Sequence, residues 1–163
     1  MSDCFEGRLA EATRIVVLGV GTEFRSDDIA GILVARQVEK AFAARSDLLV
    51  IQGCSAPENF TGPIIGFYPS HLVVIDCAEL EAPSGTVKLF PIENIAGVSS
   101  NTHSLPLNVV FDYILKNCPC EILVVGIQPR SLEFDGSPSK EVVDAARLIA
   151  RTLIGVVRSM GKR

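Results

Sequence analysis

The sequence predicts a three-layer α/β fold, in which helices cover both faces of a mostly parallel sheet. Two observations support this fold class. Short apolar segments rich in valine and isoleucine alternate with longer segments whose apolar residues recur every three or four positions. Glycine, proline or polar residues close each short segment, as expected where a buried strand leaves a sheet.

The length and composition of the chain favour one globular domain. Of its 163 residues, 48% are hydrophobic and 21% are charged, which is far from the composition of disordered chains. No linker or internal repeat divides the sequence, so we expect a single domain over residues 1–163.

Charge and cysteine content exclude several classes of protein. The formal net charge of −4 predicts no basic surface for nucleic acid or anionic membranes. No apolar run is long enough to span a membrane, and the first residues lack the features of a signal peptide. The five cysteines include no Cys-x-x-Cys pair, which predicts reduced thiols. We therefore expect a cytoplasmic monomer.

Five strands are predicted from the short apolar segments. They cover residues 14–19, 48–51, 72–77, 86–90 and 121–127. The fourth segment follows the third after only a turn, which leaves no room for the crossover helix that a parallel neighbour requires. The fourth strand is therefore expected to be an antiparallel edge strand.

Three amphipathic helices are predicted from the longer segments. The first covers residues 28–44. The second is capped by Ser104 and buries Leu107, Phe111 and their neighbours on one face. The third opens at Ser137-Pro138 and carries an apolar stripe as far as Met160.

Three residues with metal-binding side chains follow or precede these elements. Asp28 lies after the first strand, Asp76 closes the third strand, and His103 precedes the Ser104 helix. Ligands of open α/β sheets bind at the carboxyl ends of the strands, and two carboxylates with one imidazole suit nickel or zinc. Helix capping by Asp28, a turn at Asp76 and a loop role for His103 are equally compatible with the spacing.

The segment Gly19-Val20-Gly21 also invites a nucleotide-binding interpretation, because it follows a strand and precedes a helix. Phe24 stands where the third glycine of a dinucleotide motif is expected. Asp27 and Asp28 would repel a pyrophosphate at this helix start. The sequence therefore argues against a nucleotide site.

Five segments resemble, in the same order, the motifs of the hydrogenase maturation endopeptidases, and above all the HycI-type branch. They are GVGTEFRSDDIAG at 19–31, GCSAPEN at 53–59, VVID at 73–76, THSLPLN at 102–108 and GIQP at 126–129. The resemblance implies a five-stranded twisted sheet flanked by helices. It also implies an endopeptidase that removes the C-terminal extension of the large-subunit precursor of a nickel–iron hydrogenase after nickel insertion.

The same resemblance assigns roles to individual residues. Asp28, Asp76 and His103 would bind nickel, which is that of the substrate, and other divalent metals could take its place. Asp28 or Asp76 would act as general base, unless the metal itself polarises the scissile carbonyl or activates water. The alternative is a non-catalytic nickel-site sensor or chaperone for the immature large subunit.

Three residues depart from the motifs of the family. Thr22 stands where asparagine is usual, Ile29 where this branch often has glycine, and Gln52 where an aspartate commonly precedes the glycine-rich turn. The three expected ligands are kept, so the departures bear on substrate fit and rate more than on metal contact. Gln52 is the best support for the non-catalytic alternative.

Overall fold

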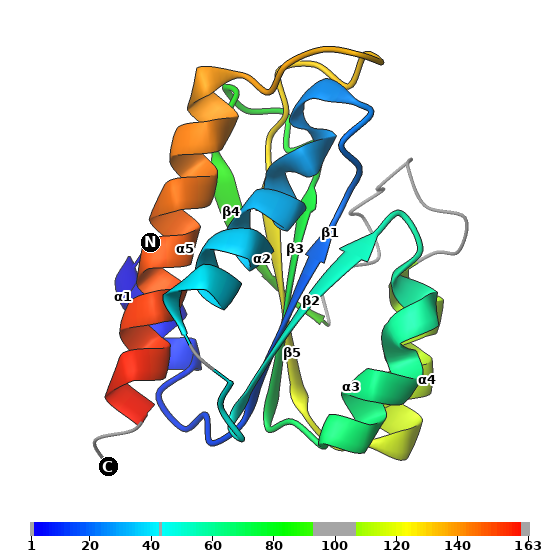
Figure 1. Ribbon diagram of the computed structural model, residues 1–163, viewed down its shortest axis with the longest axis vertical. Coiled ribbons are helices and arrows are strands. Elements are labelled where there is room, and N and C mark those ends of the chain that lie inside the picture. Colours follow the sequence, from blue (N-terminus) through cyan, green and yellow to red (C-terminus); the bar gives the residue numbers. More distant parts are fainter. Residues whose placement is uncertain (1, 43, 93–106, 161–163) are drawn as a thin grey trace.

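The computed structural model describes residues 2–42, 44–92 and 107–160, which form a five-stranded sheet between two layers of helices (Figure 1). The strand order is β2-β1-β3-β5-β4. The strands are β1 (Ile15–Val20), β2 (Leu48–Cys54), β3 (His71–Cys77), β4 (Val87–Pro91) and β5 (Glu121–Ile127). All pair in parallel except β4, which is antiparallel to β5. The predicted fold class and its antiparallel edge strand are confirmed.

The helices divide between the two faces of the sheet (Figure 1). One face is covered by α1 (Ser2–Arg8), α2 (Ala30–Ala41) and α5 (Lys140–Met160), and the other by α3 (Thr61–Phe67) and α4 (Leu107–Asn117). Single 3-10 turns, η1 (Ser26–Ile29) and η2 (Pro57–Phe60), precede α2 and α3. Within the described ranges, no helix combines the length and the apolar character needed to cross a bilayer.

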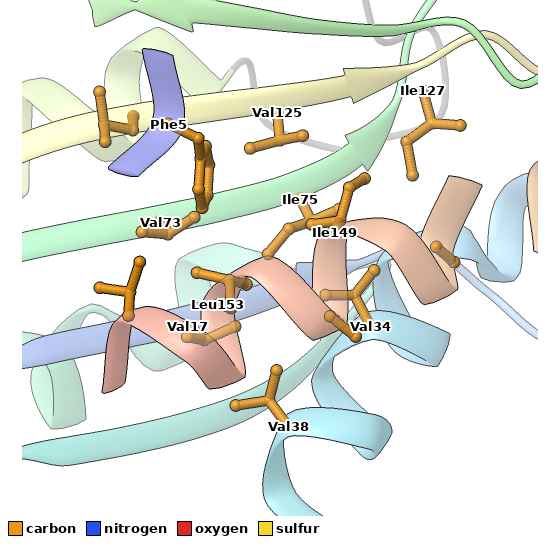
Figure 2. Close-up of a cluster of buried hydrophobic side chains, with 14 of the residues drawn as sticks. Phe5, Val17, Val34, Val38, Val73, Ile75, Val125, Ile127, Ile149 and Leu153 are labelled. Carbon is orange, nitrogen blue, oxygen red and sulfur yellow. The ribbon is translucent and has the colours of Figure 1, made fainter. Parts of the chain in front are cut away.

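Alternation along the strands produces two separate cores. Val17 and Val73 point toward α2 and α5, where they pack with Val34 and Leu153 (Figure 2). Their neighbours in sequence point to the opposite face and pack under α3 and α4. Strand β3 is buried at all seven positions, which explains the continuous apolar run Leu72–Ile75 at its centre.

The helix boundaries differ from those predicted. The first helix begins as the turn η1 and ends at Ala41, because Phe42 has extended backbone (φ −130°). The last helix begins at Lys140 rather than at Ser137-Pro138. Helices α1 and α3 were not predicted. Helix α3 contains two glycines and a proline, and these residues disfavour a helix. The expected cap, Ser104, lies outside the described residues.

Candidate active site

Glycines bring the start of α2 directly against the carboxyl ends of the strands. Gly21 has a φ of +134°, and a Cβ on it would overlap the carbonyl oxygen of Asp28. A Cβ on Gly31 would overlap the carbonyl oxygens of Val20 and Ile75, which belong to β1 and β3. The glycines of the first motif therefore serve close backbone packing, which accounts for the motif without a nucleotide.

Three buried aspartates gather where η1 meets the end of β3. Asp27, Asp28 and Asp76 are each at most 2% exposed. The Cys77 Sγ donates to the carbonyl oxygen of Asp27 at 3.0 Å. Burial raises the pKa of the Cys77 thiol well above its ordinary value, and the charges of Asp76, Asp28 and Asp27 raise it further. Such effects require proximity, so the three carboxylates lie in the neighbourhood of this thiol.

Burial of three carboxylates this close together has a cost that their surroundings must offset. Burial removes water from a carboxylate, and a second carboxylate nearby repels it. Groups held in such surroundings cluster at functional sites. A positively charged ligand at Asp28 and Asp76 would relieve the repulsion, so the arrangement favours binding of a cation.

The predicted ligand set is tested only in part. Asp28 and Asp76 lie at the predicted end of the sheet, whereas His103 lies outside the described residues. Among the residues that the structure describes, no three His, Cys, Asp or Glu side chains are arranged to hold a metal ion. Convergence of all three predicted ligands remains a prediction.

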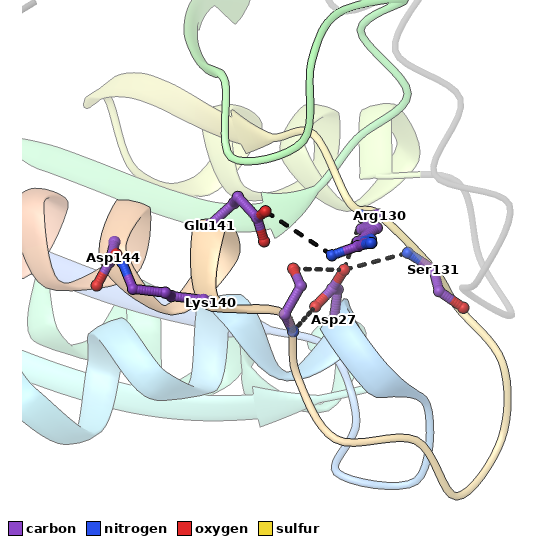
Figure 3. Close-up of polar contacts among 7 residues, drawn as sticks. Asp27, Arg130, Ser131, Lys140, Glu141 and Asp144 are labelled. Atoms are coloured by element: carbon purple, nitrogen blue, oxygen red, sulfur yellow. Dashed lines mark hydrogen bonds and ion pairs between the residues drawn. The ribbon is translucent and has the colours of Figure 1, made fainter.

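Asp27 has a different role from its neighbour Asp28. Its carboxylate accepts hydrogen bonds from the backbone N–H groups of Arg130 (2.7 Å) and Ser131 (3.1 Å), and from both the N–H (2.5 Å) and the hydroxyl (3.0 Å) of Ser139 (Figure 3). Helix α5 starts one residue later, and a carboxylate suits the positive end of a helix dipole. Asp27 thus fixes the β5–α5 loop, a role that the sequence analysis missed.

The motif at residues 53–59 shapes the neighbouring end of β2. Cys54 has a φ of +49°, and its carbonyl oxygen accepts a hydrogen bond from the Gly21 N–H at 3.0 Å. A Cβ on Gly53 would overlap the side chain of Leu18. Pro57 then starts η2. The motif therefore joins the end of β2 to the first loop.

The motif at residues 126–129 fastens the β3–β4 connection next to Asp76. The buried Gln128 accepts a hydrogen bond from the Leu80 N–H through its side-chain oxygen (2.6 Å). Its backbone N–H donates to Thr86, and its carbonyl oxygen accepts from Gly85. Gln128 therefore holds the chain that leaves β3 against the end of β5.

Two of the departures from the family motifs fit their local backbone. The Thr22 hydroxyl oxygen accepts a hydrogen bond from the Phe24 N–H at 3.3 Å, the bond that an asparagine side chain makes in the same kind of turn. Ile29 has a φ of −72°, which needs no glycine. Neither substitution disturbs the turn that carries Asp28.

Gln52 is held by charged residues of α2. Its side-chain oxygen accepts from Arg36 Nε at 3.0 Å, and its Nε2 donates to Glu39 at 3.1 Å. Arg36 also pairs with Glu23 of the first loop. An amide can satisfy both a cation and an anion, whereas an aspartate would repel Glu39. Gln52 thus links β2 to α2. Because this structural role accounts for the residue, Gln52 does not support the non-catalytic alternative.

Comparison with known proteins decides the family. The profile described as hydrogenase maturation protease matches residues 32–156, which is most of the chain. The chain belongs to this family. It is therefore a peptidase with the α/β fold of the hydrogenase maturation endopeptidases.

Individual relatives align with most of the chain. A protein of Methanocaldococcus jannaschii, assigned by its name to the hydrogenase maturation proteases, is 30% identical over 98% of both chains. The hydrogenase 3 maturation protease of Escherichia coli is 32% identical over 86% of this chain and 88% of its own. The crystal structure of the NiFe hydrogenase maturation protease HycI from Thermococcus kodakarensis superposes with a TM-score of 0.88, at 28% identity, over 95% and 99% of the two chains.

Proposed function

We propose that this protease removes the C-terminal extension of the large-subunit precursor of a nickel–iron hydrogenase, and that it acts after nickel has been inserted. The observation that carries the proposal is the burial of Asp28 and Asp76 at the carboxyl ends of the parallel strands. Names of relatives support the substrate class, because the Thermococcus protein is a NiFe hydrogenase maturation protease. The protease acts in the cytoplasm as a monomer, and the four cysteines with described side chains are free thiols.

Asp28, Asp76 and His103 contact the nickel that the substrate brings. Two carboxylates and an imidazole leave coordination positions open, so they can complete the shell of an ion already held by the large subunit. Cys77 is not one of these contacts, since its thiol donates a hydrogen bond to the Asp27 carbonyl oxygen. The free protein therefore holds metal weakly, and dialysis against a chelator should leave its activity toward nickel-loaded precursor unchanged; a lost activity would indicate a resident metal.

Docking of the substrate nickel fixes the scissile bond beside the aspartates. Positioning of this kind supplies a large part of many rate enhancements. Asp28 or Asp76 then takes a proton from the attacking water as general base, or the nickel polarises the carbonyl. In both routes the two aspartates act only when nickel is present.

The test is an intact-mass assay of nickel-loaded large-subunit precursor incubated with the purified protease. We expect the precursor to lose its C-terminal peptide. Asp76→Asn and His103→Ala should prevent this loss, whereas Asp112→Asn, the same chemical change on an exposed residue of α4, should not. A stable complex whose precursor mass never changes would contradict the proposal and indicate a sensor or chaperone.

A further inference from the structure

Two loops are joined above the carboxyl ends of the strands. One follows β1 and the other follows β5. Arg25 and Phe134 form an isolated antiparallel bridge between them. Three hydrogen bonds reinforce the bridge: Arg25 Nε to the Leu132 carbonyl (3.0 Å), the Ser26 hydroxyl to the Glu133 carbonyl (2.8 Å) and the Asp135 N–H to the Phe24 carbonyl (3.1 Å).

Each of these loops presents an exposed phenylalanine. Phe24 is 72% exposed and Phe134 is 71% exposed, the highest values among the large hydrophobic side chains that the structure describes. The Arg25 guanidinium lies over the Phe134 ring, 5.0 Å from its centre. A single exposed apolar residue is ordinary, but aromatic rings held on fixed backbone beside a site are typical of interfaces.

Both loops are connected to Asp27. Phe24 lies three residues before Asp27, in the turn that leads into η1. The second loop is held at its two ends by the Asp27 carboxylate, which accepts hydrogen bonds from Arg130 and Ser139. A molecule that covers the two rings therefore lies at the end of the sheet that holds Asp28 and Asp76.

We propose that Phe24 and Phe134 are anchors that dock the large-subunit precursor onto the protease. The proposal rests on the proposed function, because it names the surface by which that substrate is held. Continuity with the aspartates identifies the occupant as the substrate. A second copy of the chain on these loops would cover the site that the substrate must reach.

The test compares Phe24→Ala, Phe134→Ala and the double variant in cleavage of nickel-loaded precursor. Truncation of a buried interface aromatic commonly weakens binding about tenfold or more. We expect each single variant to raise KM roughly tenfold and the double variant to raise it further, with kcat within about twofold of the wild type. Tyr113→Ala, at a 54% exposed aromatic residue of α4, should leave KM unchanged.

A further variant separates apolar docking from loop stiffness. Phe134→Leu removes the contact with Arg25 but keeps an apolar side chain, so it should reverse most of the rise in KM that Phe134→Ala causes. A KM for Phe134→Leu equal to that of Phe134→Ala would overturn the docking role. Thermal unfolding of each variant identifies any that fails to fold.

The remaining outcomes distinguish the two proposals. If the wild type cuts the precursor and the double variant cuts it with the same KM, the docking role is overturned and the proposed function stands. If the wild type does not cut the precursor, the proposed function fails. Docking can then still be tested by binding, and equal precursor Kd values for the wild type and the double variant would overturn it. A wild-type dimer in sedimentation that the double variant loses would assign the rings to a second copy instead.

Discussion

The two ends of the sheet handle charge in different ways. At the amino end, arginines bond to a carboxylate or to the backbone: Arg8 pairs with Glu121 at 2.9 Å, and the Arg14 guanidinium donates twice to the Phe67 carbonyl oxygen. At the carboxyl end, ion pairs such as Arg36–Glu23 lie at the surface, but three aspartates are also buried close together. The amino end therefore stabilises the fold, whereas the carboxyl end holds charge that suits a cationic ligand.

The same contrast between stability and ligand binding separates the adjacent residues Asp27 and Asp28. Asp27 accepts four hydrogen bonds from the β5–α5 loop, so we assign it to stability. Asp28, equally buried, is assigned to the substrate nickel. Substitutions at these positions should separate stability from proteolysis.

The largest effect is expected for Asp28→Asn. Removal of one carboxylate from the expected nickel contact should slow single-turnover cleavage of nickel-loaded precursor by about a hundredfold or more, a barrier increase of roughly 2.7 kcal/mol. Thermal stability should stay the same or increase, because repulsion from Asp76 is relieved. A variant that cuts normally, or that melts well below the wild type, would show that Asp28 is structural.

Asp27→Asn should show the opposite pattern in stability. The new amide would place a donor against the N–H groups that now donate to Asp27, and charge-assisted hydrogen bonds would be lost. We expect the free energy of unfolding to fall by about 3 kcal/mol. Chemical denaturation measures this loss, and Asp112→Asn should change stability by less than about 0.5 kcal/mol. Equal stability of the wild type and Asp27→Asn would contradict the conclusion that Asp27 anchors the β5–α5 loop.

At the amino end, Arg14→Ala should reduce stability without affecting cleavage. The variant loses two hydrogen bonds to Phe67 and a cation–π contact with its ring at 4.3 Å. A loss of about 1–2 kcal/mol is expected by chemical denaturation. The stability of Arg14→Lys should lie between those of the wild type and Arg14→Ala, since lysine keeps the charge but lacks the planar guanidinium group. A tenfold change in kcat/KM for Arg14→Ala would mean that the two ends are coupled.

The smallest effect concerns pH. Burial lowers the pKa of His71, although Glu121 opposes the shift. The unfolded chain therefore binds a proton more readily than the folded chain near pH 6.5. The His71 contribution to stability is complete above that pH and decreases as the pH falls below it, by at most about 1.4 kcal/mol per pH unit. His71→Gln should flatten this part of the stability curve, and an unchanged slope would contradict the assignment.

Much of the fold could be predicted because its signals are local. The central residues of β3 and β5 form continuous apolar runs, and the turn before β4 is too short for a crossover. Helix α3 could not be recognised, since its sequence TGPIIGF disfavours a helix. Burial of Ile64 and a left-handed cap at Tyr68 hold it in place, and both depend on tertiary structure.

The candidate site was predictable only to the extent that strand ends reveal it. Asp28 and Asp76 could be named because each lies where a strand meets the ligand end of the sheet. The role of Asp27 depends on Arg130 and Ser139, more than a hundred residues away. Two adjacent aspartates, and a serine directly before a long helix, were the signals available in the sequence.

The central claim is that the aspartates act through the nickel of the substrate. Without nickel, the extension would be held only by ordinary peptide contacts, in no fixed geometry for the scissile bond. The most direct measurement is the rate at which the wild-type protease cuts matched preparations of nickel-loaded and nickel-free precursor, followed by intact mass. We predict cleavage of the loaded form alone; equal rates for the two forms would contradict the claim, even though the protein would remain a protease.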